Sequence, residues 1–233
     1  MAVQQIYQFY AELEDYKPKI WRRFQVRDNA TVAMLGYIVM TMYEMQASHL
    51  LAIEHERPFL TPSGRSSKRM EELGRYDIPD PEGEWLELGG KDATKVKLSQ
   101  LNLDAPSRLN VWYDFGDDWR VLVTLEKIMA DADLSDKKEF PCVLEGAGFG
   151  IIEDCGGIGG LEELAEAFKT KSGDEYDNFR EWLGVDDLDL TSFDIDDMNF
   201  RLQKIPDIFA DIYEKHKIPN QRSIDLIERA YKE

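Results

Sequence analysis

The sequence of 233 residues carries 46 acidic and 28 basic side chains, which gives a formal net charge of −18. A surface this negative repels phosphate backbones and anionic lipids at long range, which argues against nucleic-acid and membrane-surface partners. Because 43% of the residues are hydrophobic and 11% aromatic, the chain can fill a sizeable core, and this excludes wholesale disorder. The length suits one large domain, or a domain with a small appendage.

Cysteine usage and targeting patterns bear on the compartment. Cys142 and Cys155 are the two cysteines, and they have no CxxC spacing, so a reducing compartment fits better than a secreted, disulfide-rich one. The first residues lack a basic start followed by an apolar run, and no segment approaches the roughly 18–20 apolar residues of a membrane span. These features predict a soluble, cytoplasmic protein without a membrane partner.

Two strand-favouring segments open the chain. Residues 4–13 and 19–26 are rich in aromatic and other strand-forming residues, and residues 15–18 supply a turn between them. This pattern predicts a β-hairpin. Its second half is basic, through Lys17, Lys19, Arg22 and Arg23.

A helix and a third strand are predicted next. Asn29 or Thr31 can cap a helix whose apolar residues recur at helical spacing to about residue 46. Residues 48–56 then have the composition of a strand.

Regular patterning weakens after this strand. Residues 57–91 contain prolines, glycines and many charges, which predicts an exposed excursion with a short strand at 85–88. A short helix is predicted over residues 95–101.

A second hairpin is predicted in the middle of the chain. Residues 108–115 and 119–129 are strand candidates, and Gly116 between them permits a tight reversal. A polar loop is predicted over residues 131–138.

The last third of the chain is predicted to be mainly helical. Residues 140–160 are rich in glycine and precede a helix over 161–169, and the six aspartates between Asp186 and Asp197 suit a solvated capping segment. Further helices are predicted over residues 175–183, 198–204, 207–214 and 223–232.

Strands therefore concentrate in the first two thirds of the chain and helices in the last third. Such segregation favours an α+β fold over alternating βαβ units. We expect an antiparallel or mixed sheet packed by helices, followed by a helical C-terminal extension. The predicted division is an α+β domain over residues 1–170 and the extension over residues 171–233.

The motif YDFGDDW at residues 113–119 crowds three carboxylates and an indole at the tip of the second hairpin. Asp114 and Asp117 could bind a hard metal ion or act as a general base. The alternative is turn chemistry, because aspartate accepts backbone hydrogen bonds at turns and glycine adopts positive φ.

The motif EDCGGIGG at residues 153–160 stands directly before a predicted helix. Its glycine amides could hold an anion, but the phosphate-binding patterns GxxxxGK[ST] and GxGxxG are missing, so a tight loop of small residues is the alternative. Cys155 near a helix start could have a lowered pKa and be reactive, or it could be a small buried residue.

Histidine is scarce, and no complete catalytic set can be assembled from the sequence. His49 and His55 stand six residues apart on a predicted strand, too far to chelate one ion, so no metal ligands are assigned. A site that combines His49 with Cys155 or with a carboxylate remains open. Catalytic residues and cofactors stay unassigned.

Several motifs, in this order, resemble the plasmid pRiA4b ORF-3-like family. They are PKIWRR at residues 18–23, Ser48-His49-Leu50 after a helix, the YDFGDDW motif closing on Leu125-Glu126, and EDCGG at residues 153–157. The resemblance covers about residues 4–170, and the joint order is far more specific than any single motif.

This resemblance implies an α+β domain of largely unknown function, sometimes associated with plasmids or mobile elements. Family members commonly carry a histidine where this chain has Val121, and two prolines where it has Ile151 and Ile152. The missing histidine weakens an inherited metal or acid–base role. A pocket shared with the family would be lined by His49, Asp114, Asp117, Trp119, Glu153, Asp154 and Cys155.

The leading hypothesis from the sequence is a non-enzymatic interaction or accessory module that contacts a protein partner through its C-terminal helices. It rests on the lack of a complete catalytic set. One alternative is a metal-dependent, hydrolase-like enzyme that uses the hairpin carboxylates with His49. Another is nucleic-acid binding through the basic strand at residues 17–23. The sequence assigns no substrate, partner or oligomeric state.

Overall fold

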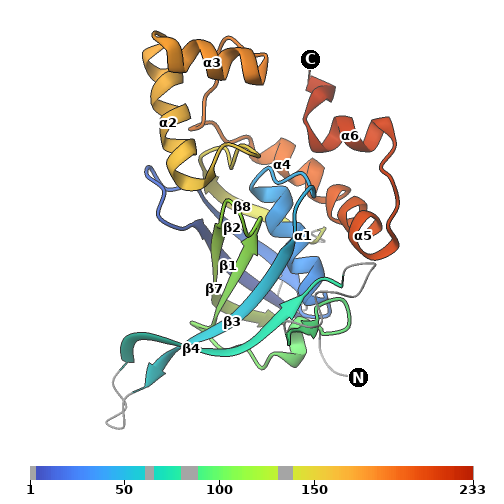
Figure 1. Cartoon of the computed structure of the whole chain (residues 1–233). Helices are drawn as coiled ribbons and strands as arrows, with labels where there is room; N and C mark the ends of the chain where they lie inside the picture. The colour runs from blue at the N-terminus through green and yellow to red at the C-terminus, as the bar shows by residue number, and fades with distance from the viewer. Residues whose placement is uncertain (1–3, 61–65, 80–88, 131–138, 233) are drawn as a thin grey trace.

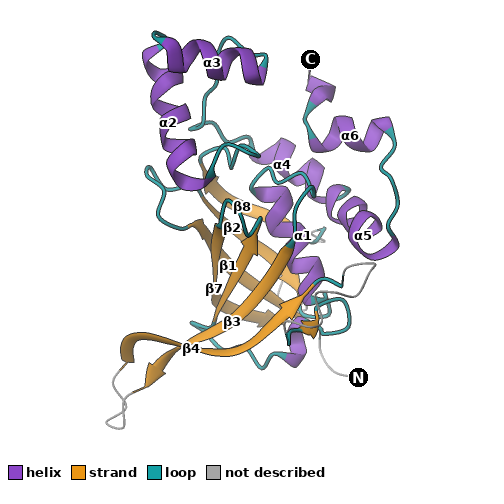
Figure 2. Ribbon diagram, viewed as in Figure 1, coloured by secondary structure: helices purple, strands orange, loops and turns teal. Residues whose placement is uncertain are grey.

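A single mixed sheet forms the centre of the fold (Figures 1 and 2). The computed structural model describes residues 4–60, 66–79, 89–130 and 139–232, without the side chains of 58–60, 66–71 and 232. Within these residues the strands are β1 (Gln5–Leu13), β2 (Trp21–Arg27), β3 (Leu51–Leu60), β4 (Ser66–Asp77), β5 (Lys91–Asp92), β6 (Arg108–Tyr113), β7 (Trp119–Ala130) and β8 (Cys142–Ala147).

The eight described strands lie in the order β5-β4-β3-β6-β7-β1-β2-β8. All neighbours are antiparallel except β4 and β5, which are parallel. The helices gather over one face and one end of this sheet (Figure 2). They are α1 (Val32–Met42), α2 (Gly157–Thr170), α3 (Asp174–Leu183), α4 (Ile195–Leu202), α5 (Ile205–Lys215) and α6 (Gln221–Ile227).

Helix α1 is the buried helix of the core. The hydroxyl of Thr31 accepts a hydrogen bond of 3.0 Å from the amide of Met34 and so caps its start. Every residue of α1 except Met34 is buried, because the helix packs against β3, β4, α4 and α5. It ends at Met42 with Tyr43 as its C-cap, before the predicted residue 46, and Glu44 then adopts a left-handed φ of 61°.

Strand β7 shows why the sheet has one apolar face. Trp119, Val121 and Val123 alternate with half-buried polar or apolar side chains, so the period-two pattern places them against the helical layer. On the opposite face Arg23 of β2 forms an ion pair of 2.8 Å with Glu126.

The C-terminal helices share this core. Met198, Leu202, Ile205 and Phe209 are buried in the same cluster as the sheet and α1. Asn199 of α4 also pairs with the edge strand β8, since its side-chain amide accepts from the Val143 amide (2.7 Å) and donates to the Val143 carbonyl (3.1 Å). Helix α4 therefore covers part of an edge that could otherwise recruit another strand.

The α+β fold class and the two hairpins predicted from the sequence are confirmed. The prediction of an irregular excursion over residues 57–91 was wrong for Ser66–Asp77, because these residues form β4 and pair with β3. The glycine-rich interval 140–160 also contains β8, and the helix over residues 95–101 reduces to a 3₁₀ turn at Leu98–Gln100. The predictions for residues 85–88 and 131–138 lie outside the described residues.

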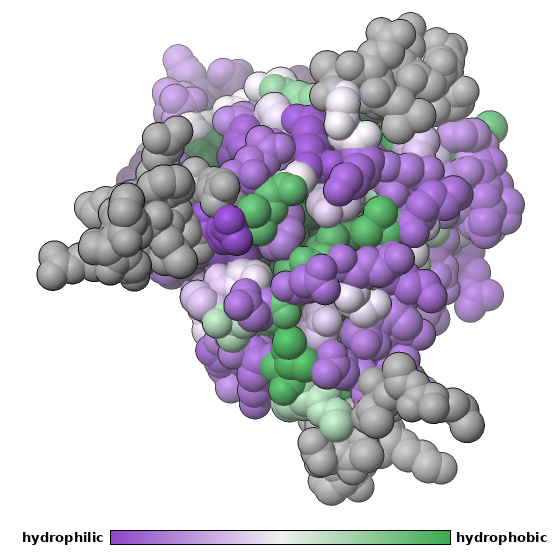
Figure 3. Space-filling view, turned by 90° about the horizontal axis from the view of Figure 1, so that it is seen from below, coloured by the Kyte–Doolittle hydropathy of each residue, from purple (hydrophilic) through white to green (hydrophobic). Residues whose placement is uncertain are grey.

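The described surface seen from below is mainly hydrophilic, with an irregular stripe of hydrophobic residues (Figure 3). Within the described residues, no helix has the length and hydropathy that are needed to cross a membrane.

Candidate functional site

The two motifs singled out in the sequence meet in space. The amide of Gly156 donates a hydrogen bond of 3.1 Å to Oδ2 of Asp117 at the β6–β7 tip. Gly157 adopts a φ of +71°, and a Cβ atom there would lie 2.5 Å from the carbonyl oxygen of Asp117. A side chain at position 157 would therefore separate the loops, so glycine is needed for this contact.

His49 lies between the two loops, just before β3. The carbonyl of the next residue, Leu50, accepts a hydrogen bond of 3.0 Å from the amide of Asp114. The His49 carbonyl accepts one of 2.5 Å from the phenol of Tyr213 on α5. The imidazole also stands edge-on to the ring of Tyr113, with 5.7 Å between the ring centroids. Contacts from β6, the hairpin tip and α5 thus fix this residue.

The imidazole of His49 faces three carboxylates. Its Nε2 atom lies 3.2 Å from Oδ1 of Asp154, 3.5 Å from Oδ2 of Asp114 and 3.5 Å from Oε2 of Glu153. One ligand atom each from His49, Asp114 and Asp154 can be chosen so that all three lie within 4.8 Å of one another. The structure therefore gathers a compact nitrogen and oxygen donor set, the type that binds divalent metal ions.

Turn geometry presents the aspartates to His49. Asp114 has a φ of 50° and Asp154 a φ of 59°, and aspartate tolerates this left-handed region better than most residues. Oδ1 of Asp114 accepts a hydrogen bond of 3.0 Å from the Gly116 amide, while Oδ2 faces the imidazole. The two interpretations of this motif are therefore compatible, because one carboxylate both closes the turn and faces the cluster.

Glu153 is the most buried acid of the cluster, with 9% of its side chain exposed. Its Oε1 accepts hydrogen bonds from the amide of Gln46 (2.6 Å) and the phenol of Tyr113 (2.7 Å). Its Oε2 is buried without a hydrogen-bond partner. Burial raises the pKa of Glu153 above its ordinary value, although these hydrogen bonds and His49 act in the opposite direction.

A hollow of about 480 Å³ opens beside the cluster. It brings His49 and Asp114 together with apolar and aromatic side chains, so a bound molecule could reach the donor atoms of these two residues. The lining residues are Ala47, Ser48, His49, Leu50, Asp114, Phe115, Gly116 and Tyr213.

Three of the predicted pocket residues have other surroundings. Trp119 is fully buried in the core, and Asp117 joins the two loops. Sγ of Cys155 lies 3.7 Å from the carbonyl of Gly157, and burial, followed by the charge of Asp117, raises its pKa to about 12. Cys155 is partly buried against the core, so of its two interpretations the packed small residue fits better than a reactive thiolate.

Tyr113 and Tyr213 take part in the site but were not predicted as site residues. Tyr113 directly precedes Asp114 in the sequence, and this position could have indicated that it belongs to the site. Tyr213 follows His49 by 164 positions, so no local pattern connects them.

The basic strand is largely paired within the protein. The guanidinium of Arg22 is buried and donates to the carbonyls of Trp21, Ala147, Gly148 and Phe149, and burial lowers its pKa to about 10. Arg23 pairs with Glu126 and Glu145, and Lys19 pairs with Glu12. Arg22 therefore serves the fold and is inaccessible to a nucleic-acid backbone.

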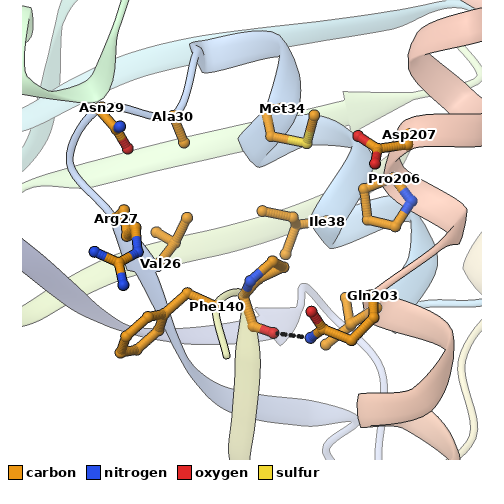
Figure 4. A pocket seen from close by; sticks show the side chains of 12 residues that line it. Val26, Arg27, Asn29, Ala30, Met34, Ile38, Phe140, Gln203, Pro206 and Asp207 are labelled. Carbon is orange, nitrogen blue, oxygen red and sulfur yellow. Dashed lines mark hydrogen bonds between the residues drawn. The ribbon is translucent and has the colours of Figure 1, made fainter. Parts of the chain in front are cut away.

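Another cavity, of about 260 Å³, lies between α1, the end of β2 and the α4–α5 junction (Figure 4). Val26, Met34 and Ile38 give it an apolar wall, and the side-chain amide of Gln203 donates to the carbonyl of Pro141 at 2.8 Å. None of the predicted pocket residues lines this cavity.

Comparison with known proteins identifies the family. The sequence model of the plasmid pRiA4b ORF-3-like protein family matches residues 5–201. The chain belongs to this family. The match reaches further toward the C-terminus than the predicted resemblance over residues 4–170. It includes every residue of the carboxylate and histidine cluster, while α5 with Tyr213 lies beyond it.

A solved structure supports the assignment of the fold. The protein of unknown function MM3350 from Methanosarcina mazei Go1 aligns with a TM-score of 0.66 and 27% identity, covering 84% of this chain and 98% of that one. None of the curated proteins matches the chain. Neither the family description nor this neighbour supplies an activity, so function is argued from the site.

The structure shows the surroundings of position 121, where the resemblance led us to expect a histidine. Val121 occupies it, is fully buried and pairs with Val111 in the sheet. The imidazole of the cluster belongs to His49.

Proposed function

We propose that this pRiA4b ORF-3-like protein is a metal-dependent hydrolase whose divalent ion is held by His49, Asp114 and Asp154. The observation that carries the proposal is the meeting of one imidazole nitrogen with three carboxylates beside an open hollow. Three protein ligands that leave a further position for water or substrate are typical of catalytic metal sites.

The spacing of the donor atoms fits a shared ion. Ligands about 2.1 Å from one tetrahedral ion stand about 3.4 Å from each other. Nε2 of His49 lies 3.2 Å from the Asp154 oxygen and 3.5 Å from the Asp114 oxygen. Small rotations of the carboxylates would complete the set, since all three donor atoms already lie within 4.8 Å of one another.

A protonated imidazole is the competing explanation of the same arrangement. Its single Nε2–H can donate one good hydrogen bond, yet Asp114, Glu153 and Asp154 all face that nitrogen at 3.2–3.5 Å. Two of the carboxylates would then remain without a hydrogen bond from the ring. A divalent ion balances more of this negative charge, which is why we favour metal binding.

Glu153 suits the role of general base. Hydrogen bonds from Gln46 and Tyr113 fix one carboxylate oxygen, and the unpartnered oxygen faces the donor set. A bound divalent ion lowers the pKa of water to about 7. Glu153 would accept a proton from that water while the water oxygen attacks the substrate. It would then donate this proton to the leaving group when the scissile bond breaks.

Metal titration tests this proposal. Protein purified without an affinity tag and treated with a chelator would be titrated with Zn²⁺ and Mn²⁺ by calorimetry. One ion per chain is expected, with at least a tenfold loss of affinity on His49→Ala or Asp114→Asn. Asp118→Asn is the matched control, because Asp118 lies on the same hairpin and pairs with Arg120 instead. Absent stoichiometric binding, or an equal loss in the control, would overturn the proposal.

A second function, binding of a protein partner through the C-terminal helices, is favoured by α3. None of its residues is buried, and Trp182 is 49% exposed. Exposed tryptophan is a frequent anchor of protein interfaces. A photo-cross-linking residue placed at position 185 would test this function. Specific adducts with a partner should form and should disappear when Trp182→Ser is added. Identical adducts with and without Trp182→Ser would contradict this function.

Nucleic-acid binding remains a weaker candidate. The buried Arg22 leaves Lys17, Lys19 and Arg23 as the basic side chains of this strand that a phosphate could reach. Two of these, Lys19 and Arg23, already form ion pairs. The association with plasmids suggested by the family name likewise has no structural support among the described residues.

A further inference from the structure

A second cavity adjoins the hollow beside the histidine and carboxylate cluster. It measures about 200 Å³ and is lined by Leu50, Leu51, Ile78, Pro79, Ile212, Tyr213 and His216. Leu50 and Tyr213 line both cavities. The two spaces are therefore neighbours that share part of their walls.

The lining of this cavity is almost entirely apolar. Leu51 and Ile78 are 3% and 6% exposed and form a buried floor. The phenol of Tyr213 is occupied by its hydrogen bond to the His49 carbonyl, so its ring is the part available to a ligand. A hydrocarbon chain or ring gains free energy by leaving water for such a surface, whereas a charged group would lose its hydration.

Helix α5 couples this cavity to the cluster. Ile212 lines the apolar space, and its neighbour Tyr213 holds the backbone of His49. Both residues lie beyond residue 201, where the family match ends. The α5 side of the apolar wall thus comes from a part of this chain that the family model does not describe, while Leu50, Leu51, Ile78 and Pro79 lie within the matched range.

Two other cavities in the described part of the chain have no such connection to the histidine and carboxylate cluster. The one in Figure 4 shares no residue with the cluster. A cavity of about 570 Å³ beside α2, lined by residues such as Tyr16, Phe168 and Leu188, also shares none. The cavity next to the hollow therefore allows both ends of a ligand to be inferred: one end at the donor atoms and the other in the apolar space.

We infer that the two cavities form one substrate site for an ester or amide of an apolar carboxylic acid. The inference rests on the proposed hydrolase function and adds its substrate class. The acyl carbonyl lies at the cluster, and the hydrocarbon part of the acid fills the cavity between Ile78 and Ile212. A neutral acyl group suits this acidic protein better than a phosphate ester, which its net charge of −18 would repel.

The hydrolysis balances without a further reactant. Water adds its oxygen to the acyl carbon, and the bond from that carbon to the leaving oxygen or nitrogen breaks. Glu153 transfers the proton of the water to the leaving group, which departs as an alcohol or amine.

Alkyl hydroxamates of increasing length test the inference on the Zn²⁺-loaded protein. The hydroxamate group binds the metal ion, and the alkyl chain reports on the neighbouring cavity. Affinity should rise about fourfold for each added methylene between acetohydroxamate and hexanohydroxamate, until the cavity is filled. A molecule that touches the metal alone would show no dependence on chain length.

Two substitutions at Ile212 locate the effect. Ile212→Ser should reduce the gain from chain length, and Ile212→Phe should fill the cavity and abolish it. Both should reduce hexanohydroxamate affinity much more than acetohydroxamate affinity. Ile208→Ser is the matched control, because Ile208 is half-buried on the same helix and outside the cavity. The phenylalanine variant keeps an apolar residue, so it tests the cavity even if the serine variant is unstable.

The possible outcomes separate the two proposals. Failure to bind Zn²⁺ would overturn the hydrolase function and this inference together. Binding of Zn²⁺ and acetohydroxamate without a gain from chain length would overturn the substrate class alone. A gain that survives both Ile212 substitutions would also overturn it, because the alkyl chain would then lie elsewhere.

Discussion

The phenol of Tyr213 donates a hydrogen bond of 2.5 Å to the backbone carbonyl of His49. This contact joins α5 to the residue that carries the only imidazole of the cluster within the described chain. Burial raises the pKa of Tyr213 above its ordinary value, so the hydroxyl keeps its proton and remains a donor. The ring also stacks on Tyr37 of α1, at 5.7 Å between centroids. Helix α5 therefore positions the site from outside the two sequence motifs.

Tyr213→Phe should weaken both the fold and metal binding. The substitution keeps the stacked ring but leaves the His49 carbonyl without its donor, which costs about 1 kcal/mol of unfolding free energy. Freed from this restraint, His49 should bind Zn²⁺ several-fold more weakly. Denaturant unfolding and calorimetry measure the two effects. Tyr176→Phe is the control, because it removes a hydrogen bond to the Asp186 carbonyl, which is not part of the cluster. Metal affinity should not change in this variant.

Glu153→Gln should stabilise the metal-free protein at neutral pH. Burial raises the pKa of Glu153 above 4.5, so the folded state holds the proton more tightly than the unfolded chain. Stability from this group is fully present at pH values below 4.5 and is lost as the pH rises through the folded pKa. Glutamine cannot ionise, and its side-chain oxygen can still accept from Gln46 and Tyr113.

The measurement is the unfolding free energy of both proteins from pH 4 to pH 8 in the presence of a chelator. The unfolding free energy of Glu153→Gln should exceed that of the unsubstituted protein above the folded pKa of Glu153, and the difference should vanish at the acidic end of the range. A greater advantage at acidic pH would contradict the burial argument. With Zn²⁺ present the order should reverse, because an ionised Glu153 favours the bound cation.

The strands that could be predicted are those whose own residues alternate. The β7 segment shows the alternation of a half-buried strand, and Gly116 marks the reversal before it. Strand β4 lacks this alternation and is rich in charged residues, so its conformation follows from pairing with β3 rather than from its composition. Strand β8 was not predicted because it contains Gly146, and glycine is unfavourable in strands. The structure explains this glycine, since a Cβ atom there would lie 2.8 Å from the side chain of Arg22.

The residues of the candidate site could be picked out where they stand in local sequence motifs. Asp114, Glu153 and Asp154 stood in conspicuous runs, and His49 followed from the family resemblance. Their mutual distances depend on how the sheet brings the loops together, which no single segment encodes. Trp119 was drawn into the predicted pocket by sequence proximity, but strand alternation turns its side chain into the core. Whether residues 171–233 form a separate extension stays a prediction.

Glu44→Gln should be among the most destabilising single changes in the protein. Both carboxylate oxygens of Glu44 lie 2.7 Å from Nη1 of Arg201, and Arg229 binds the same carboxylate. The side chains of Glu44 and Arg201 are 6% and 2% exposed. Removing the negative charge leaves two guanidinium groups poorly compensated, which costs about 3–5 kcal/mol in buried pairs.

Denaturant unfolding measures this loss, and Glu166→Gln is its control. Glu166 forms an ion pair of 3.0 Å with Lys169, but both side chains are largely exposed. Such a pair contributes about 0–1 kcal/mol. Losses of similar size in the two variants would show that the buried pair does not hold the C-terminal helices on α1.

Gly157→Ala should uncouple the two loops that carry the metal donors. Gly157 has a φ of +71°, and a Cβ atom would lie 2.5 Å from the backbone carbonyl of Asp117. Strain at a left-handed alanine costs about 1 kcal/mol or more before that contact is relieved.

Gly159→Ala is the matched control, because it lies in the same helix with nothing within 4 Å of its added Cβ. Alanine there should stabilise the protein by up to about 1 kcal/mol. If Gly157→Ala displaces Asp154 from His49, Zn²⁺ affinity must fall in that variant and stay constant in the control. Unchanged affinity in both would mean that the contact between the loops is dispensable for the donor set.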